Sequence, residues 1–266
     1  MGRIGETFVR LRAARERALV PFITGGDPDL DTTEALVLAM AESGADLIEI
    51  GVPFSDPTAE GPTIQRSSER ALAGGATLRR ILERVKVLRP RVDVPLLLMG
   101  YANPFYAMGA EGFVEAAAEV GVDGIIVVDL PPEEGEALFH AAELRGIDPV
   151  LLAAPTTVES RLKLLADRTR GFLYYVALTG VTGARAELAA DLEADVGRIR
   201  EHSEVPVCVG FGISTPEHAR LVGGFADGVV VGSAIVDRIE AAPSKEAAVD
   251  AVAQFVAELK APLRAT

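Results

Sequence analysis

The chain alternates between short apolar runs and longer amphipathic stretches. Eight runs rich in β-branched residues recur, at 18–23, 46–51, 94–99, 123–128, 147–153, 171–177, 205–210 and 227–232. Their nearly continuous hydrophobicity is typical of strands that are covered on both faces, as in a parallel sheet. The pattern therefore predicts eight strands that alternate with helices.

Several of the amphipathic stretches carry signals for the start of a helix. In three of them a capping side chain precedes a glutamate by three residues, which predicts N-caps at Asp31, Thr156 and Ser214. A short helix is also expected at the N-terminus, where Ile4, Phe8 and Leu11 recur on one helical face.

Alternation of strands and helices fits either a doubly wound open sheet or a closed barrel. The count of eight strands favours the α/β fold of the (β/α)8 or TIM barrel, and 266 residues agree with the roughly 250 that this fold needs. No flexible linker divides the chain, so we expect one barrel domain over residues 1–266 with an N-terminal helix. Because the second and third runs begin 48 residues apart, at 46 and 94, an additional segment is expected after the second strand.

Composition excludes several classes of partner and site. The net charge of −13 would repel a nucleic-acid backbone. No apolar run is long enough for a membrane span, and the first residues lack the apolar centre of a signal peptide, so we expect a cytoplasmic protein with no membrane partner. The single Cys208 lies in an apolar run, and the three histidines lack metal-ligand spacing. We therefore expect no metal.

Glu49 is the first candidate for chemistry. It lies between two isoleucines near the end of the second predicted strand, where barrels of this kind place functional groups. Burial of such a carboxyl raises its pKa toward neutrality, and the group can then both donate and accept a proton. The alternative is a side chain that points outward and pairs with an arginine, and the residues alone leave both interpretations open.

The loop that follows, 52–62, contains three prolines and two further acids, Asp56 and Glu60. Both acids fit ordinary turn chemistry and a solvated loop. Glu60 also fits a catalytic role, because two carboxylates that converge on one substrate can divide acid and base work.

Glycines at three later strand ends suggest a phosphate site. They lie in the segments 179–183, 210–214 and 232–235. Gly212 and Gly232 let the backbone approach a ligand, Ser233 adds a hydroxyl, and a short helix is expected to begin at Ser233. Turn glycines without a ligand are the alternative. No dinucleotide or Walker motif is present. With neither a metal nor a plausible Ser/His/acid arrangement, acid–base catalysis on a bound phosphorylated compound is the simplest chemistry left.

Longer strings in the sequence carry a family resemblance. The chain resembles the tryptophan synthase α subunit family in LIEIGVPFSDPTAEGPTIQ (47–65), YANP (101–104), LTGVTGAR (178–185), VGFGIS (209–214) and ADGVVVGSAIV (226–236). The resemblance implies a carbon–carbon lyase of tryptophan biosynthesis. The reaction is the retro-aldol cleavage of indole-3-glycerol phosphate to indole and glyceraldehyde 3-phosphate.

The resemblance also implies roles for single residues. Glu49 matches the acid–base residue and Glu60 the second acid. Substrate-binding positions are implied at Phe22, Ile64, Tyr101, Tyr174, Thr182, Gly183, Phe211, Gly212, Gly232 and Ser233. The implied partner is the β subunit in an α2β2 complex, approached by Pro53, Asp56 and Asn103. No cofactor is implied for this chain, since pyridoxal phosphate belongs to the β subunit.

One position departs from the family pattern, which has Asp where this chain has Glu60. The extra methylene displaces the carboxylate by about 1 Å, a misplacement that costs up to about 10²-fold in rate. Two alternatives to a partnered lyase therefore stay open, a catalytically weak chain that mainly activates the β subunit and a stand-alone lyase.

Overall fold

The computed structural model describes residues 2–177, 185–210 and 212–265. Three of the predicted substrate-binding residues, Thr182, Gly183 and Phe211, lie outside the described residues.

The strands form a closed parallel barrel. They are β1 (Ala18–Thr24), β2 (Ile48–Gly51), β3 (Leu96–Gly100), β4 (Gly124–Val127), β5 (Asp148–Pro149), β6 (Leu151–Ala153), β7 (Leu173–Val176), β8 (Val207–Gly210) and β9 (Gly228–Val231). Their hydrogen-bonded order is β5-β4-β3-β2-β1-β9-β8-β7-β6. Since β5 and β6 are consecutive parts of one strand interrupted at Val150, the two ends of the sheet meet. The predicted TIM barrel of eight parallel strands is confirmed.

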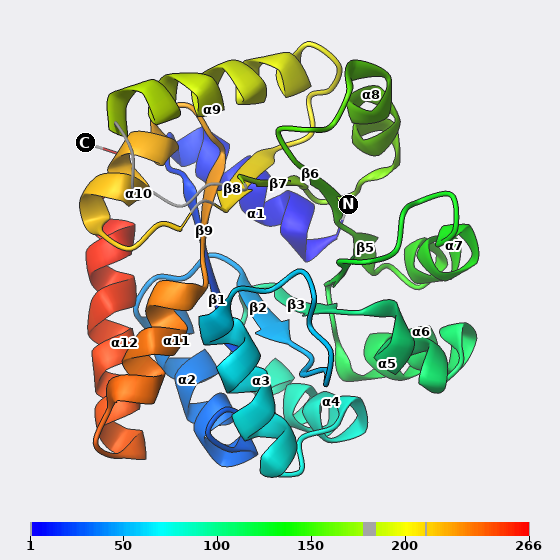
Figure 1. Ribbon diagram of the computed structural model, residues 1–266, viewed down its shortest axis with the longest axis vertical. Helices are drawn as coiled ribbons and strands as arrows, with labels where there is room; N and C mark the ends of the chain where they lie inside the picture. Colours follow the sequence, from blue (N-terminus) through cyan, green and yellow to red (C-terminus); the bar gives the residue numbers. More distant parts are fainter. Residues whose placement is uncertain (1, 178–184, 211, 266) are drawn as a thin grey trace.

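Helices surround the barrel (Figure 1). They are α1 (Arg3–Ala14), α2 (Leu30–Glu42), α3 (Pro62–Ala73), α4 (Leu78–Leu88), α5 (Ala102–Ala107), α6 (Ala110–Val120), α7 (Glu136–Leu144), α8 (Glu159–Arg168), α9 (Arg185–Arg200), α10 (Pro216–Gly223), α11 (Ser233–Ala241) and α12 (Lys245–Lys260), with 3-10 turns at Arg89–Arg91 and Ala261–Leu263. Both α3 and α4 lie between β2 and β3, which accounts for the long interval in the sequence. None of the helices in the described part of the chain is both long and apolar enough to cross a membrane.

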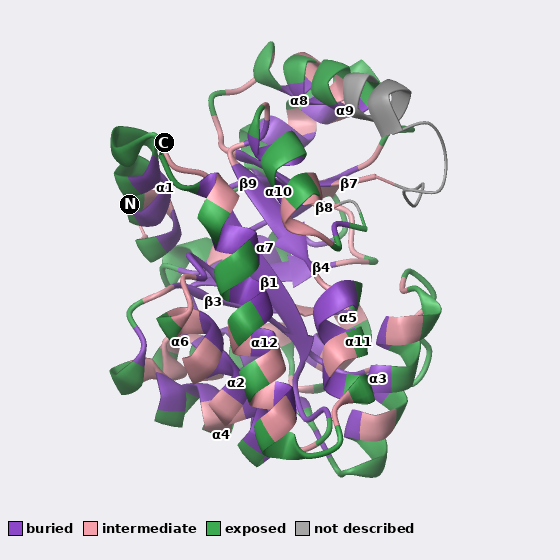
Figure 2. Ribbon diagram, turned by 90° about the vertical axis from the view of Figure 1, so that its left-hand side faces the viewer, coloured by how far each residue is buried: buried purple, intermediate pink, exposed green. Residues whose placement is uncertain are grey.

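Two apolar layers follow from the alternation of side chains along each strand. On β2, Ile48 and Ile50 pack outward against the helices, whereas Leu47, directly before the strand, packs into the barrel. Figure 2 shows the resulting arrangement, with buried strands at the centre and helices that expose their outer faces. By the same alternation Glu49 points inward, where the sequence alone had left its direction open.

Helix α1 closes one end of the barrel. Its buried face consists of Ile4, Thr7, Phe8 and Leu11, and Phe8 packs against Phe172 of the barrel interior at 5.9 Å between ring centroids. The predicted N-terminal helix and its apolar face are confirmed. Because α1 fills the end at which the strands begin, a ligand enters the barrel from the end at which they finish.

The three predicted N-caps were wrong by one or two residues. Helix α2 is capped by Asp29, whose side chain accepts from the Thr32 N–H. Helix α10 is capped by Thr215, because Pro216 takes the first helical position that suits a residue without an N–H. Before α8, Thr157 accepts from the Ala154 N–H in a turn, and the helix begins only after Val158.

Candidate active site

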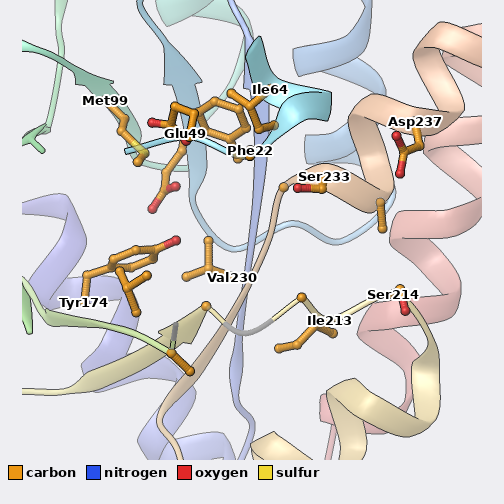
Figure 3. A pocket seen from close by; sticks show the side chains of 18 residues that line it. Phe22, Glu49, Ile64, Met99, Tyr174, Ile213, Ser214, Val230, Ser233 and Asp237 are labelled. Carbon is orange, nitrogen blue, oxygen red and sulfur yellow. The ribbon is translucent and has the colours of Figure 1, made fainter. Parts of the chain in front are cut away.

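A cavity of about 550 Å³ lies at the carboxyl ends of the strands. Its wall combines β1, β2, β3, β7, β8 and β9 with the loop before α3 and the start of α11, and its residues are Phe22, Glu49, Glu60, Gly61, Ile64, Met99, Tyr174, Val176, Ala177, Gly210, Gly212, Ile213, Ser214, Val230, Gly232, Ser233, Ala234 and Asp237. Figure 3 shows Glu49 beside Phe22 and Met99, with Ser214 and Ser233 across the cavity.

Glu49 is completely buried, and neither carboxyl oxygen has a hydrogen-bond partner in the described structure. Desolvation, followed by repulsion from the Glu60 carboxylate, raises the pKa of Glu49 from 4.5 to about 8. A carboxyl group with this pKa holds a proton at neutral pH and releases it at little cost, which suits a group that acts as acid and base in turn.

Glu60 lines the same cavity from the loop between β2 and α3. It is half-buried, and burial raises its pKa above the ordinary value. Both of its backbone polar groups are hydrogen-bonded. The Glu60 N–H donates to the Pro57 carbonyl, and the Gln65 side chain donates to the Glu60 carbonyl. The two acids that the sequence singled out therefore share one cavity.

Apolar and aromatic side chains form the wall next to Glu49. Phe22 and Ile64 belong to a small cluster with Val236, and Tyr174 extends from β7 into the barrel interior. Glycines on neighbouring strands leave room for the two rings. A Cβ on Gly51 would lie 2.5 Å from Cζ of Phe22, and one on Gly210 would lie 2.6 Å from the hydroxyl of Tyr174.

This close approach predicts the effect of a single methyl group. In Gly51→Ala, the new Cβ would also lie 2.7 Å from Cε2 of Phe22, so the ring must move into the cavity. We expect kcat/KM to fall about tenfold or more, since overpacking displaces a wall of the cavity in which a substrate would bind. Steady-state kinetics tests this, with Gly112→Ala as the control because nothing lies within 4 Å of the added methyl. Equal kinetics in both variants would contradict the prediction.

The opposite end of the cavity is rich in backbone donors. Gly232 precedes α11, and the N–H groups of Ile235 and Val236 both donate to its carbonyl. The two residues before them, Ser233 and Ala234, have no carbonyl within the helix to which their N–H groups can donate, so these groups can bind an anion. The predicted helix start at Ser233 is confirmed. Gly212 has a φ of +53°, a left-handed conformation that favours glycine.

Other predicted residues lie outside this wall. Tyr101 faces a smaller neighbouring cavity together with Phe54, Pro57 and Glu60. Pro53 is buried, whereas Asp56 and Asn103 are exposed.

The predicted site residues did not include several residues of the wall, among them Met99, Val176, Ile213, Ser214, Val230 and Asp237. Most are ordinary apolar residues at strand ends, so only their place in the barrel reveals them. Asp237 is one turn into α11, where its carboxylate accepts from the Thr63 hydroxyl at 3.0 Å. Among the described residues, no three His, Cys, Asp or Glu side chains gather to hold a metal ion.

Comparison with models of protein families identifies the family of this chain. Residues 8–264 match the family model described as "Tryptophan synthase alpha chain". The chain belongs to the tryptophan synthase alpha chain family. As a member of this family it is an indole-3-glycerol-phosphate lyase of tryptophan biosynthesis, as the resemblance implied.

Curated relatives and solved structures agree with the family. The tryptophan synthase alpha chain of Geotalea uraniireducens is 53% identical over 100% of this chain and 99% of its own length. That of Geobacter sulfurreducens is 53% identical over 98% of both chains. The crystal structure of the tryptophan synthase alpha chain from Legionella pneumophila has a TM-score of 0.89 at 39% identity, and covers 99% of this chain and 97% of its own. A chain of tryptophan synthase from Mycobacterium tuberculosis has a TM-score of 0.90 at 32% identity and covers 100% and 99%.

Proposed function

We propose that Glu49 carries both proton transfers in the cleavage of indole-3-glycerol phosphate. Protonated Glu49 gives its proton to C3 of the indole ring. The resulting carboxylate takes the proton of the hydroxyl group next to the bond that breaks. The bonding electrons return to the ring, and indole and glyceraldehyde 3-phosphate leave. The proposal rests on the complete burial of a carboxyl group without a hydrogen-bond partner, at the end of a barrel strand.

The two ends of the cavity suit the two ends of this substrate. Phe22, Ile64 and Tyr174 supply apolar walls for a flat ring. Gly212, Gly232 and Ser233 would bind the phosphate through backbone N–H groups and a hydroxyl. The proposed roles of Thr182, Gly183 and Phe211 in binding rest on the sequence resemblance alone.

Glu60 is proposed as the second acid, which stabilises charge at the indole nitrogen. Its position in the cavity with Glu49 favours the lyase over a chain that mainly activates a partner, because a pure activator needs no second carboxylate there. We further propose that residues 1–266 act as one domain.

We also propose a β subunit as the partner, in an α2β2 complex. Solved structures similar to this chain include tryptophan synthase of Mycobacterium tuberculosis. Asp56 and Asn103 are exposed and, with Pro53, follow β2 and β3 at the same end of the barrel. Pyridoxal phosphate would be held by the β subunit.

An assay of indole release tests the proposed reaction. Indole-3-glycerol phosphate is supplied to the purified chain with and without a β subunit, and indole and glyceraldehyde 3-phosphate are measured. We expect both products in equal amounts, formed faster with the partner. Absence of indole under both conditions would overturn the proposed function, and full turnover by the chain alone would favour the stand-alone lyase.

The pH dependence of the reaction gives a separate prediction. Since the pKa of Glu49 is about 8 and the first step needs its proton, kcat/KM is expected to fall about tenfold per pH unit above that value. Glu60→Gln removes the charge that contributes to this raised pKa, so the alkaline limb moves to lower pH. Measurement of kcat/KM for both proteins from about pH 6 to about pH 10, about two units on each side of the pKa, tests this prediction. If the alkaline limb of the profile did not move, the Glu60 carboxylate would have no effect on the pKa of Glu49.

A further inference from the structure

The loop between β2 and α3 is held from outside the active-site cavity. Ala59, next to Glu60, donates its backbone N–H to the hydroxyl oxygen of Tyr101 at 2.8 Å. The ring of Tyr101 also packs against Phe54 of the same loop, with 5.2 Å between centroids and an interplanar angle of 30°. One side chain therefore contacts the loop at both its beginning and its end.

Tyr101 is itself fixed in place. It is 4% exposed and lies between the end of β3 and the start of α5. The next residue, Ala102, donates its N–H to the Asp129 carboxylate at 2.7 Å, which ties this corner to the segment after β4. A buried aromatic ring on such a corner offers the loop a rigid support.

The far end of the loop is anchored separately. Helix α3 begins two residues after Glu60, and Arg66 of α3 pairs with Glu240 of α11 at 2.7 Å. Thr63 donates to Asp237 on α11. Because these contacts do not involve Tyr101, loss of its hydroxyl would release the loop before Glu60 and leave α3 in place.

We propose that Tyr101 is a positioning residue that holds the Glu60 carboxylate in the active-site cavity, through the Ala59 N–H and the Phe54 ring. The proposal rests on the proposed role of Glu60 in the reaction. Tyr101 lines the small cavity beside Glu60 and is not among the residues of the main cavity wall, so it acts on Glu60 from outside. Burial and the nearby Glu60 carboxylate both raise the pKa of Tyr101, although the hydrogen bond from Ala59 opposes them.

The Tyr101→Phe variant removes the acceptor of the Ala59 N–H and keeps the ring. We expect kcat for indole release to fall about tenfold, because a small displacement of a reacting group has a large effect on rate. KM should stay within about twofold, since the phosphate end of the cavity is untouched. Tyr106→Phe is the control, because Tyr106 lies on the neighbouring α5 and is 42% exposed. Unchanged kcat in Tyr101→Phe would overturn the proposal.

A double variant separates positioning from other effects. If Tyr101 acts through Glu60, Tyr101→Phe should lower kcat little further in a Glu60→Gln background. Losses that multiply would overturn the positioning role. A Glu60→Gln variant with a normal kcat would overturn the role of Glu60 itself, and with it the proposal. A lowered kcat in the Glu60→Gln variant together with a normal kcat in the Tyr101→Phe variant would overturn the positioning role alone. Thermal unfolding of each variant checks that the barrel is intact.

Discussion

Glu49→Gln is expected to lose at least about 10³-fold in kcat for indole release, because glutamine neither donates nor accepts the proton that the reaction needs. The substitution keeps the shape of the side chain and puts a neutral amide in a site that already favours the neutral form of the acid. Binding should therefore survive. Isothermal titration calorimetry with glyceraldehyde 3-phosphate is expected to give a Kd within a fewfold of that of the wild-type chain.

The same variant has a testable effect on stability. Between pH 4.5 and about 8, folded Glu49 holds a proton that the unfolded chain has released, so its burial lowers the free energy of unfolding as the pH rises through this window. Glutamine does not titrate, so the Glu49→Gln variant avoids this fall in the free energy of unfolding. Relative to the wild-type chain, its stability should therefore increase from about pH 5 to about pH 8, between the unfolded and folded pKa values of Glu49. A variant that retains turnover would remove Glu49 from the mechanism. One that loses activity and stability together would show that Glu49 is needed for the fold.

Lys260→Ala is expected to lower the free energy of unfolding by about 3 kcal/mol or more. Lys260 is 3% exposed, and its ammonium group lies 2.8 Å from Asp46, 3.2 Å from Glu16 and 3.0 Å from the Arg17 carbonyl. It joins the end of α12 to the start of β1 and β2. Its removal takes away a positive charge next to the buried Asp46 carboxylate. A buried charge that loses its partner lowers the stability of the folded state.

Chemical denaturation followed by circular dichroism measures this change. The matched control is Lys245→Ala, at the other end of the same helix, where the side chain is 62% exposed and pairs with Asp29 on the surface. Little change is expected there, because water screens such a pair. If the two substitutions had equal effects, the buried cluster would not be a special source of stability. Indole release should be normal in both, since neither lysine lines the active-site cavity.

The case of Glu49 shows where sequence reasoning was sufficient and where it stopped. The apolar runs predicted eight strands, and their alternation with helices predicted the barrel, because both depend on periodicities that are visible locally. An acid between two isoleucines indicated an unusual carboxyl. Its direction depended on which face of β2 turns inward, and that is decided only when the sheet closes between β5 and β6.

Residues that gather from distant segments were harder to predict. Asp237 and Val230 line the cavity. Val230 lies in the string 226–236 and Asp237 directly follows it, but neither residue type indicates a place in the cavity wall. The helix caps were missed by one or two residues because neighbouring polar side chains compete for the same N–H groups, as Asp29 and Thr215 show. Tyr101 stood out as part of a family motif, but its contact with Ala59 joins residues 42 apart.

The sequence by itself determined the strand and helix pattern, the N-terminal helix, the family, and the candidate acids Glu49 and Glu60. These follow from local periodicity and from residue types at fixed spacing. Only the tertiary structure decided that Glu49 is buried without a hydrogen-bond partner, that Glu60 shares its cavity, and that Tyr101 supports the loop beside it. The physical reason is that burial and electrostatic repulsion depend on distances between strands, which closure of the barrel fixes and no single segment encodes.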